Sequence, residues 1–166
     1  MRYCILKPLS ALYGCVLQLF HLLYDRGFFF SKSYHCPIIR LGNLALGGTG
    51  KTPMTIYLAR QICKDYSVYI ISRGYGRKSK GLREVIIDSH SDDVGDEPLM
   101  IKRKLPNIGV WVSEDRLKAI DHIESIDKRK KVYILDDAMQ HRKLNGGFQL
   151  LLTEYSFPFF QDNILP

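Results

Sequence analysis

The sequence has few cysteines and no arrangement of them that would hold a metal ion. Four of the 166 residues are cysteine, no pair has C-x-x-C spacing, and none forms a cluster with histidine. The common zinc patterns are therefore excluded, because they need closely spaced thiolate and imidazole ligands. Nor is a disulfide framework indicated, and we expect free, buried thiols in a reducing compartment.

The sequence also lacks an apolar run long enough to cross a membrane. The longest one, residues 9–24, has about 16 residues, against about 20 for a bilayer-spanning helix. Asp25 and Arg26 follow it in place of a small-x-small cleavage site, so a signal peptide is not indicated. A helix packed on the domain and a helix lying in the membrane interface both remain open. The three phenylalanines at 28–30, between Arg26 and Lys32, favour the interface.

Internal repeats and low-complexity segments are absent, and a length of 166 residues suits one domain. The net charge of +7 and the pI near 9.2 indicate an anionic partner. A nucleotide, a nucleic acid, a phospholipid or a phosphorylated substrate would each satisfy that charge. No nucleic-acid-binding motif appears, however, which counts against a nucleic acid.

What the sequence does contain is a phosphate-binding loop at residues 45–52, which read Ala-Leu-Gly-Gly-Thr-Gly-Lys-Thr. A strand-like run, 38–42, precedes it and a helix-period run follows it, which is the context this motif requires. Glycines let backbone N–H groups turn toward phosphates, and the helix N-terminus adds partial positive charge. We expect Lys51 to reach the β- and γ-phosphates and Thr52 to bind Mg²⁺. Ala45 replaces the usual first glycine, and the second glycine of the pair at 47–48 supplies some of the lost backbone freedom.

A second signal follows about 85 residues later, where four apolar residues at 132–135 end in Asp136 and Asp137. This is the Walker B pattern, in which a buried strand delivers a carboxylate to Mg²⁺ beside the phosphate loop. Further strands are expected at 67–71, 84–88, 108–112 and 148–153. Residues 45–64 are expected to form the phosphate loop and the helix after it, and further helices are expected from the block at 95–98 through Lys102 and at 117–126. This alternation predicts an α/β fold of the P-loop NTPase type, with a mostly parallel sheet, helices on both faces and a preceding N-terminal apolar helix.

Two more segments are expected near the phosphate loop. The loop at 72–78 carries Arg73 and Arg77 between glycines, and guanidinium groups bind oxyanions well, although a solvated basic turn has the same composition. Asp96 opens a helix and is a candidate N-cap. Because ligands of parallel sheets bind beyond the carboxyl ends of the strands, we expect these segments and Asp136 to meet at one edge.

Four blocks of sequence together resemble the tetraacyldisaccharide 4′-kinase family, the lipid A 4′-kinases. In order, they are GNLALGGTGKTP at 42–53, SRGYGR at 72–77, GDEP at 95–98 and DDAMQHR at 136–142. The resemblance covers most of residues 1–160. It implies an enzyme that transfers the γ-phosphate of ATP, with Mg²⁺, to the 4′-hydroxyl of a tetraacylated glucosamine disaccharide 1-phosphate. Its implied partners are this lipid A precursor and the cytoplasmic face of the inner membrane, and no nucleic acid.

The same resemblance implies roles for individual residues. Asp96 corresponds to the general base, Lys51 to the phosphate-binding lysine, and Asp136 and Asp137 to the acidic pair at the metal, together with Thr52. ATP is expected to contact Ala45, Leu46, Gly47, Gly48, Thr49, Gly50, Lys51 and Thr52. Arg73, Arg77, Arg116, Gln140 and His141 are expected near the substrate or its phosphates.

The resemblance also implies a domain organisation. Residues 1–33 correspond to the membrane-associated helix and residues 34–166 to the P-loop kinase domain. Family members continue into a second domain, which supplies a histidine that supports the base, so the lipid-binding cleft is expected to be incomplete in this chain.

Two other functions remain open. The chain could be a non-catalytic nucleotide-binding fragment or one half of a split kinase, with a complementary C-terminal half as its partner. It could also be a P-loop ATPase or GTPase of another class. Against the latter, Leu46 stands where deviant loops carry a lysine, and no Asn-Lys-x-Asp guanine signature occurs.

Overall fold

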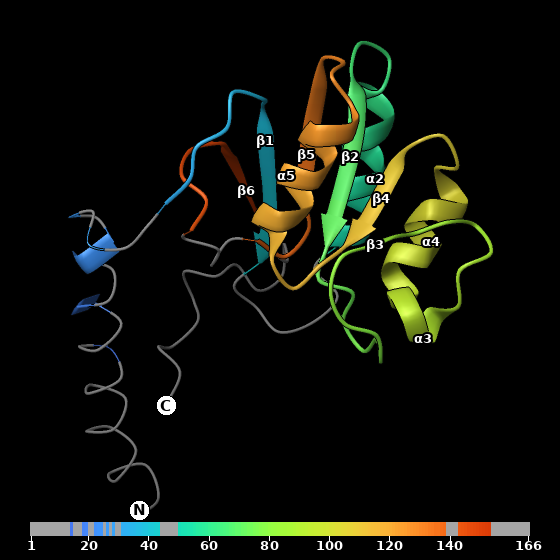
Figure 1. The fold of residues 1–166 in the computed structure, drawn as a ribbon, viewed down its shortest axis with the longest axis horizontal. Coiled ribbons are helices and arrows are strands. Elements are labelled where there is room, and N and C mark those ends of the chain that lie inside the picture. The colour runs from blue at the N-terminus through green and yellow to red at the C-terminus, as the bar shows by residue number, and fades with distance from the viewer. Residues whose placement is uncertain are drawn as a thin grey trace, which may run out of the picture.

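The computed structural model describes residues 31–43, 50–138 and 143–153, together with positions 14, 18, 19, 22–24, 26 and 28. The elements are β1 (Ile38–Asn43), α2 (Lys51–Ile62), β2 (Ser67–Ser72), β3 (Arg83–Glu84), α3 (Ser91–Val94), α4 (Asp96–Lys104), β4 (Gly109–Val112), α5 (Arg116–Ile126), β5 (Lys131–Leu135) and β6 (Phe148–Leu152). The expected strands other than that at 84–88, and the expected helix at 117–126, are confirmed to within one residue at each end (Figure 1).

The strands form one sheet in the order β3-β4-β2-β5-β1-β6. β1 lies between β5 and β6, with Ile38 opposite Tyr133 and Ile39 opposite Phe148. Every pairing in this sheet is parallel except that of β3 with β4. β5 is buried along its whole length, as expected for a central parallel strand that is covered on both faces. The predicted mostly parallel sheet is therefore confirmed.

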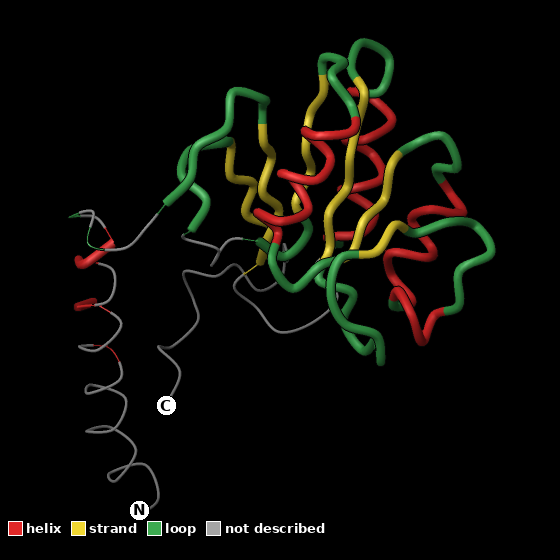
Figure 2. The backbone as a smooth tube through the Cα atoms, in the orientation of Figure 1, coloured by secondary structure: helices red, strands yellow, loops and turns green. Residues whose placement is uncertain are grey.

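Helices cover both faces of the sheet, as predicted. Side chains alternate across β5. Tyr133 belongs to the apolar cluster that contains Ile120 and Ile123 of α5, and Ile134 belongs to the cluster that contains Ile56 of α2 and Leu99 of α4. Figure 1 shows α5 in front of β5 and α2 behind β2, and Figure 2 shows the same layers as a tube. The two apolar clusters lie on opposite faces and fix the sheet between them.

The strand expected at 84–88 is wrong beyond its first residue. β3 ends at Glu84, and the main chain turns instead: Ile86 N donates to Ser89 Oγ at 3.0 Å and Ser89 N donates to Ile86 O at 3.1 Å. β3 pairs only with β4 at the edge of the sheet, so Ile86 and Ile87 have no second layer to pack against and are 55% and 48% exposed. Apolar composition alone did not reveal this edge position.

The predicted N-terminal helix lies mostly outside the described residues. Positions 14, 18, 19 and 22–24 are helical. None of the described helices combines the length and the apolar character that a bilayer crossing requires. The described thiols, Cys36 and Cys63, are free as expected, but Cys63 is exposed, so its predicted burial is wrong.

Candidate functional site

The candidate site lies at the carboxyl edge of the sheet. β5 runs beside both β1 and β2 in parallel register, so the residues that follow these three strands share one edge. Asn43 ends β1, and Asp136 follows β5. The loop at 72–78, here called the basic loop, continues from the end of β2. The helix that begins at Lys51 starts at the same edge, because Lys51 contacts both Asn43 and Asp137 there. The predicted meeting is therefore observed for Lys51, the end of β2 and the acidic pair Asp136 and Asp137. Residues 45–49 lie outside the described residues, and a place for Asp96 beside this group stays a prediction.

Lys51 is the first residue of α2 and is held by two oxygen atoms. Its Nζ donates to Asn43 Oδ1 at 2.6 Å and lies 3.5 Å from Asp137 Oδ1. Gly50 caps the helix with φ 81°, a left-handed conformation that glycine adopts without strain. Thr52 is half-buried in the first turn of α2. The other predicted ATP contacts, Ala45, Leu46, Gly47, Gly48 and Thr49, lie outside the described residues.

Asp136 is a buried carboxylate with an unused acceptor. It is 2% exposed, and its main-chain N–H donates to Ile71 O at 3.0 Å. Its Oδ1 has no hydrogen-bond partner among the residues that the structure describes. Burial raises the pKa of Asp136 to about 6, and the negative charges of Glu97 and Asp137 act in the same direction, against Lys51 and Arg116. A buried acceptor of this kind needs a cation or a donor to satisfy it.

Asp137 stands in a strained turn that Arg116 supports. It is the one described non-glycine residue with a positive φ, at 50°. Arg116 Nη2 donates to the Asp137 carbonyl oxygen at 3.1 Å, and Arg116 itself is 7% exposed. Burial lowers the pKa of Arg116, and the positive charge of Arg73 lowers it further. Arg116 therefore holds the turn that aims Asp137 at Lys51, while its predicted phosphate contact stays a prediction.

The two predicted arginines of the basic loop have different surroundings. Arg73 is exposed and close enough to Arg116 for its charge to act there. Arg77 is instead occupied, since its Nη2 lies 2.5 Å from Glu114 Oε1 and donates to Gly81 O at 2.8 Å. Its side chain is 3% exposed, so Arg77 ties the loop together in this structure. A phosphate contact for either arginine stays a prediction.

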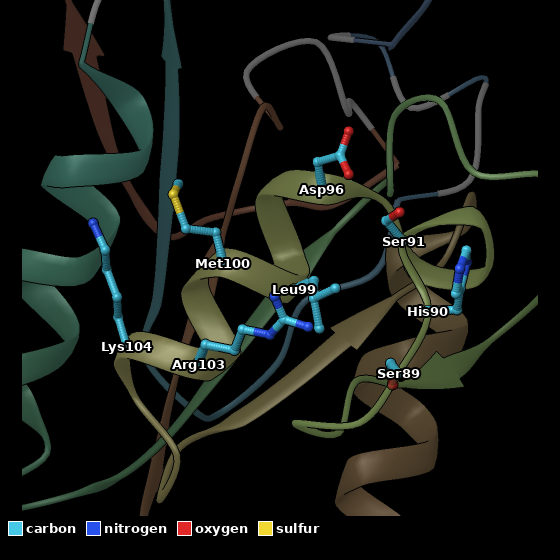
Figure 3. A pocket seen from close by; sticks show the side chains of 8 residues that line it. All are labelled: Ser89, His90, Ser91, Asp96, Leu99, Met100, Arg103 and Lys104. Carbon is cyan, nitrogen blue, oxygen red and sulfur yellow. The ribbon is translucent and has the colours of Figure 1, made fainter.

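Asp96 begins α4, but it is not the N-cap. Gly95 caps this helix, with φ 89° and no side-chain hydrogen bond, so the predicted capping role is wrong. The reason is steric: a Cβ at Gly95 would lie 3.1 Å from Tyr75 O, where the basic loop packs directly on the helix start. Asp96 also lines a hollow of about 430 Å³. Figure 3 shows Asp96 at one end of this hollow, with Arg103 and Lys104 at the other end.

Two further residues belong to this edge and were not predicted as site residues, Glu97 and Asn43. The negative charge of Glu97 acts on Asp136 and raises the pKa of that carboxyl. Glu97 lies in the same four-residue block as Asp96, at 95–98, and this position could have indicated that it belongs to the site. Gln140 and His141 were predicted near the site and lie outside the described residues.

The acidic pair fits a magnesium ion. Among the described residues, no group of three or more histidine, cysteine, aspartate or glutamate side chains is arranged to hold a metal. Magnesium does not need one, because it is usually bound by one or two carboxylates together with substrate phosphates and water. The buried, unpartnered Oδ1 of Asp136 is a suitable ligand, with Asp137 and the Thr52 hydroxyl as the other candidates.

Comparison with known proteins gives a consistent result. The model of the LpxK family, described as tetraacyldisaccharide-1-P 4′-kinase, matches residues 2–166. Tetraacyldisaccharide 4′-kinase of Porphyromonas gingivalis (strain ATCC BAA-308 / W83) is 42% identical over 163 residues, which cover 97% of this chain and 46% of that protein. The Flavobacterium psychrophilum protein of the same name is 40% identical over 161 residues, covering 97% and 47%. The chain thus spans about half the length of the curated relatives it matches.

A solved structure is similar as well. The crystal structure of the "apo" form of LpxK from Aquifex aeolicus in complex with ATP superposes with a TM-score of 0.81 at 39% sequence identity. The match covers 94% of this chain and 50% of that one.

Proposed function

The chain belongs to the tetraacyldisaccharide-1-P 4′-kinase family, and from this premise we propose that it binds ATP and Mg²⁺ at the carboxyl edge of its sheet. The proposed reaction is transfer of the γ-phosphate to the 4′-hydroxyl of a tetraacylated glucosamine disaccharide 1-phosphate, a step of lipid A biosynthesis. The observation that carries this proposal is the buried, unpartnered Asp136 beside the pair formed by Lys51 and Asp137. A fixed lysine next to two carboxylates is what a metal-bound phosphate chain requires.

In the proposed reaction, the 4′-oxygen bonds to the γ-phosphorus while the bond from that phosphorus to the β–γ bridging oxygen breaks, and ADP leaves. Lys51 and the backbone amides of the phosphate loop stabilise charge on the transferred group. Magnesium, when bound, supplies further charge neutralisation, with Asp136, Asp137 and Thr52 as its candidate ligands. Asp96 accepts the proton of the sugar hydroxyl.

Nucleotide binding is tested by calorimetric titration of ATP and Mg²⁺ into the purified chain. We expect micromolar binding, weakened to a still measurable millimolar affinity in Lys51→Ala and unchanged in Lys64→Ala. Lys64 is an exposed lysine that follows α2 at its far end. No binding by the wild-type chain would refute the proposal for this chain.

Transfer is tested separately, by following labelled phosphate from ATP to the disaccharide acceptor. We expect Asp96→Asn to leave ATP affinity unchanged and to remove transfer, and full activity in that variant would refute the base assignment. Binding without transfer, with transfer restored by adding the C-terminal half of a relative, would favour the split-kinase alternative.

Peripheral binding to the membrane surface is also part of the proposal. Three described side chains of the N-terminal region, Leu19, Leu22 and Phe28, are 58%, 45% and 74% exposed, which supports an apolar contact with lipid. In a vesicle sedimentation assay, the double variant Leu22→Ser, Phe28→Ser is expected to stay in the supernatant. Tyr57→Ser serves as the control, because Tyr57 is equally exposed but lies on α2.

A further inference from the structure

Asn43 stands at the carboxyl end of β1, directly before the phosphate loop, and none of the proposed steps uses it. The parallel register places it opposite Leu152 of β6, so its main chain is fixed within the sheet. Its Oδ1 accepts the 2.6 Å hydrogen bond from Lys51 Nζ. This contact joins the strand before the phosphate loop to the helix after it.

The two oxygens that hold Lys51 differ in kind. Asn43 offers a neutral amide oxygen at 2.6 Å, whereas Asp137 offers a charged one at 3.5 Å from a side chain that is 68% exposed. An exposed ion pair of that length is weak and easily exchanged. The amide bond is short and charge-assisted on its donor side, which makes it the stronger of the two.

The amide also leaves the lysine's charge intact. A lysine carries its ammonium on a flexible four-carbon stem. The ammonium therefore needs a fixed contact if it is to keep one position before the nucleotide binds. A carboxylate in the place of Asn43 would fix it too, but would also cancel the positive charge that phosphates require. A phosphate oxygen can replace Asp137 while Asn43 keeps its hold on Nζ.

We propose that Asn43 is a positioning residue that holds the Lys51 ammonium ready for the β- and γ-phosphates of ATP. The lysine then binds phosphate without first being ordered, and this preorganisation contributes to both binding and transfer. The inference rests on the proposed nucleotide-binding function.

A double-mutant cycle on ATP affinity tests the inference. Asn43→Leu keeps the size of the side chain but removes the acceptor, and we expect ATP affinity to fall by about tenfold. In a Lys51→Ala background the same substitution should cause no further loss, because the residue acts through Lys51. Additive losses would overturn the inference, since a purely structural role does not depend on Lys51. Asn107→Leu, in the turn before β4, is the matched control and should bind ATP normally.

A second measurement needs no nucleotide. Acylation of each lysine by an amine-reactive reagent, followed by mass spectrometry, reports how freely Lys51 Nζ moves. We expect Asn43→Leu to speed labelling of Lys51 severalfold and to leave Lys64 unchanged. An unchanged Lys51 rate would overturn the inference. Failure of the wild-type chain to bind ATP would refute the proposed function alone, and the labelling result would still decide whether Asn43 holds Lys51.

Discussion

Replacing Asp136 by asparagine should stabilise the chain when metal and nucleotide are absent, even though it removes a residue assigned to the magnesium site. Asp136 is 2% exposed, and burial, followed by the charges of Glu97 and Asp137, raises its pKa from 3.8 to about 6. Ionising this carboxyl is therefore easier in the unfolded chain than in the folded one. The folded state loses stability whenever the pH is high enough to ionise it.

The size of the effect follows from the two pKa values. Each tenfold change in the dissociation constant is worth about 1.36 kcal/mol, so the difference between 3.8 and about 6 costs the folded chain about 3 kcal/mol at pH 8. The stability is fully present below pH 3.8, falls as the pH rises, and is lost above about 6. We therefore expect Asp136→Asn to gain about 3 kcal/mol at pH 8 and less than about 1 kcal/mol at pH 4.

Urea unfolding at these two pH values, with a chelator present, measures the effect. The difference between the two gains, about 2 kcal/mol, is the decisive number, because any contribution of the new amide itself is the same at both pH values. Asp137→Asn is the matched control and should show a much smaller difference, since the side chain of Asp137 is 68% exposed. Equal gains for Asp136→Asn at pH 4 and pH 8 would refute the reasoning that burial destabilises its ionised form.

Three further predictions follow from the same edge of the sheet. Gly95→Ala should lower the free energy of unfolding by about 2 kcal/mol in thermal denaturation, because φ is +89° and the new Cβ would lie 3.1 Å from Tyr75 O. Gly81→Ala, with φ +81° and open space, should cost less. Glu97→Gln should lower the pKa of Asp136 from about 6, seen as a ¹³C NMR titration of its carboxyl carbon, and an upward shift would contradict the assigned effect of the Glu97 charge. Arg116→Met should raise that pKa in the same experiment and weaken ATP binding by disturbing the turn at Asp137.

The local features of this site that the structure describes could be predicted from the sequence. The helix that begins at Lys51 and the apolar strand ending in Asp136 each depend on a short run of residues, so their patterns were visible without the fold. Their meeting at one edge followed from the strand–helix alternation, because consecutive parallel strands expose their carboxyl ends on the same side.

Features that depend on distant partners were beyond the sequence. The ion pair between Arg77 and Glu114 joins residues 37 positions apart, and no pattern in either segment indicates it. The packing of Tyr75 against Gly95 likewise decides that glycine, not Asp96, caps α4. The edge position of β3 left Ile86 exposed although its neighbours are apolar. In each case the outcome is set by a tertiary contact and not by local preference.

The position of β1 has a consequence for the order in which the chain acquires its site. Both neighbours of β1 come from far along the sequence, since Ile38 pairs with Tyr133 and Ile39 with Phe148. During synthesis, the strand that carries the phosphate loop therefore leaves the ribosome long before either of its flanking strands exists. Lys51 cannot meet Asp137 until β5 has also emerged and docked, so the nascent chain should be unable to capture nucleotide until most of the sheet has been made.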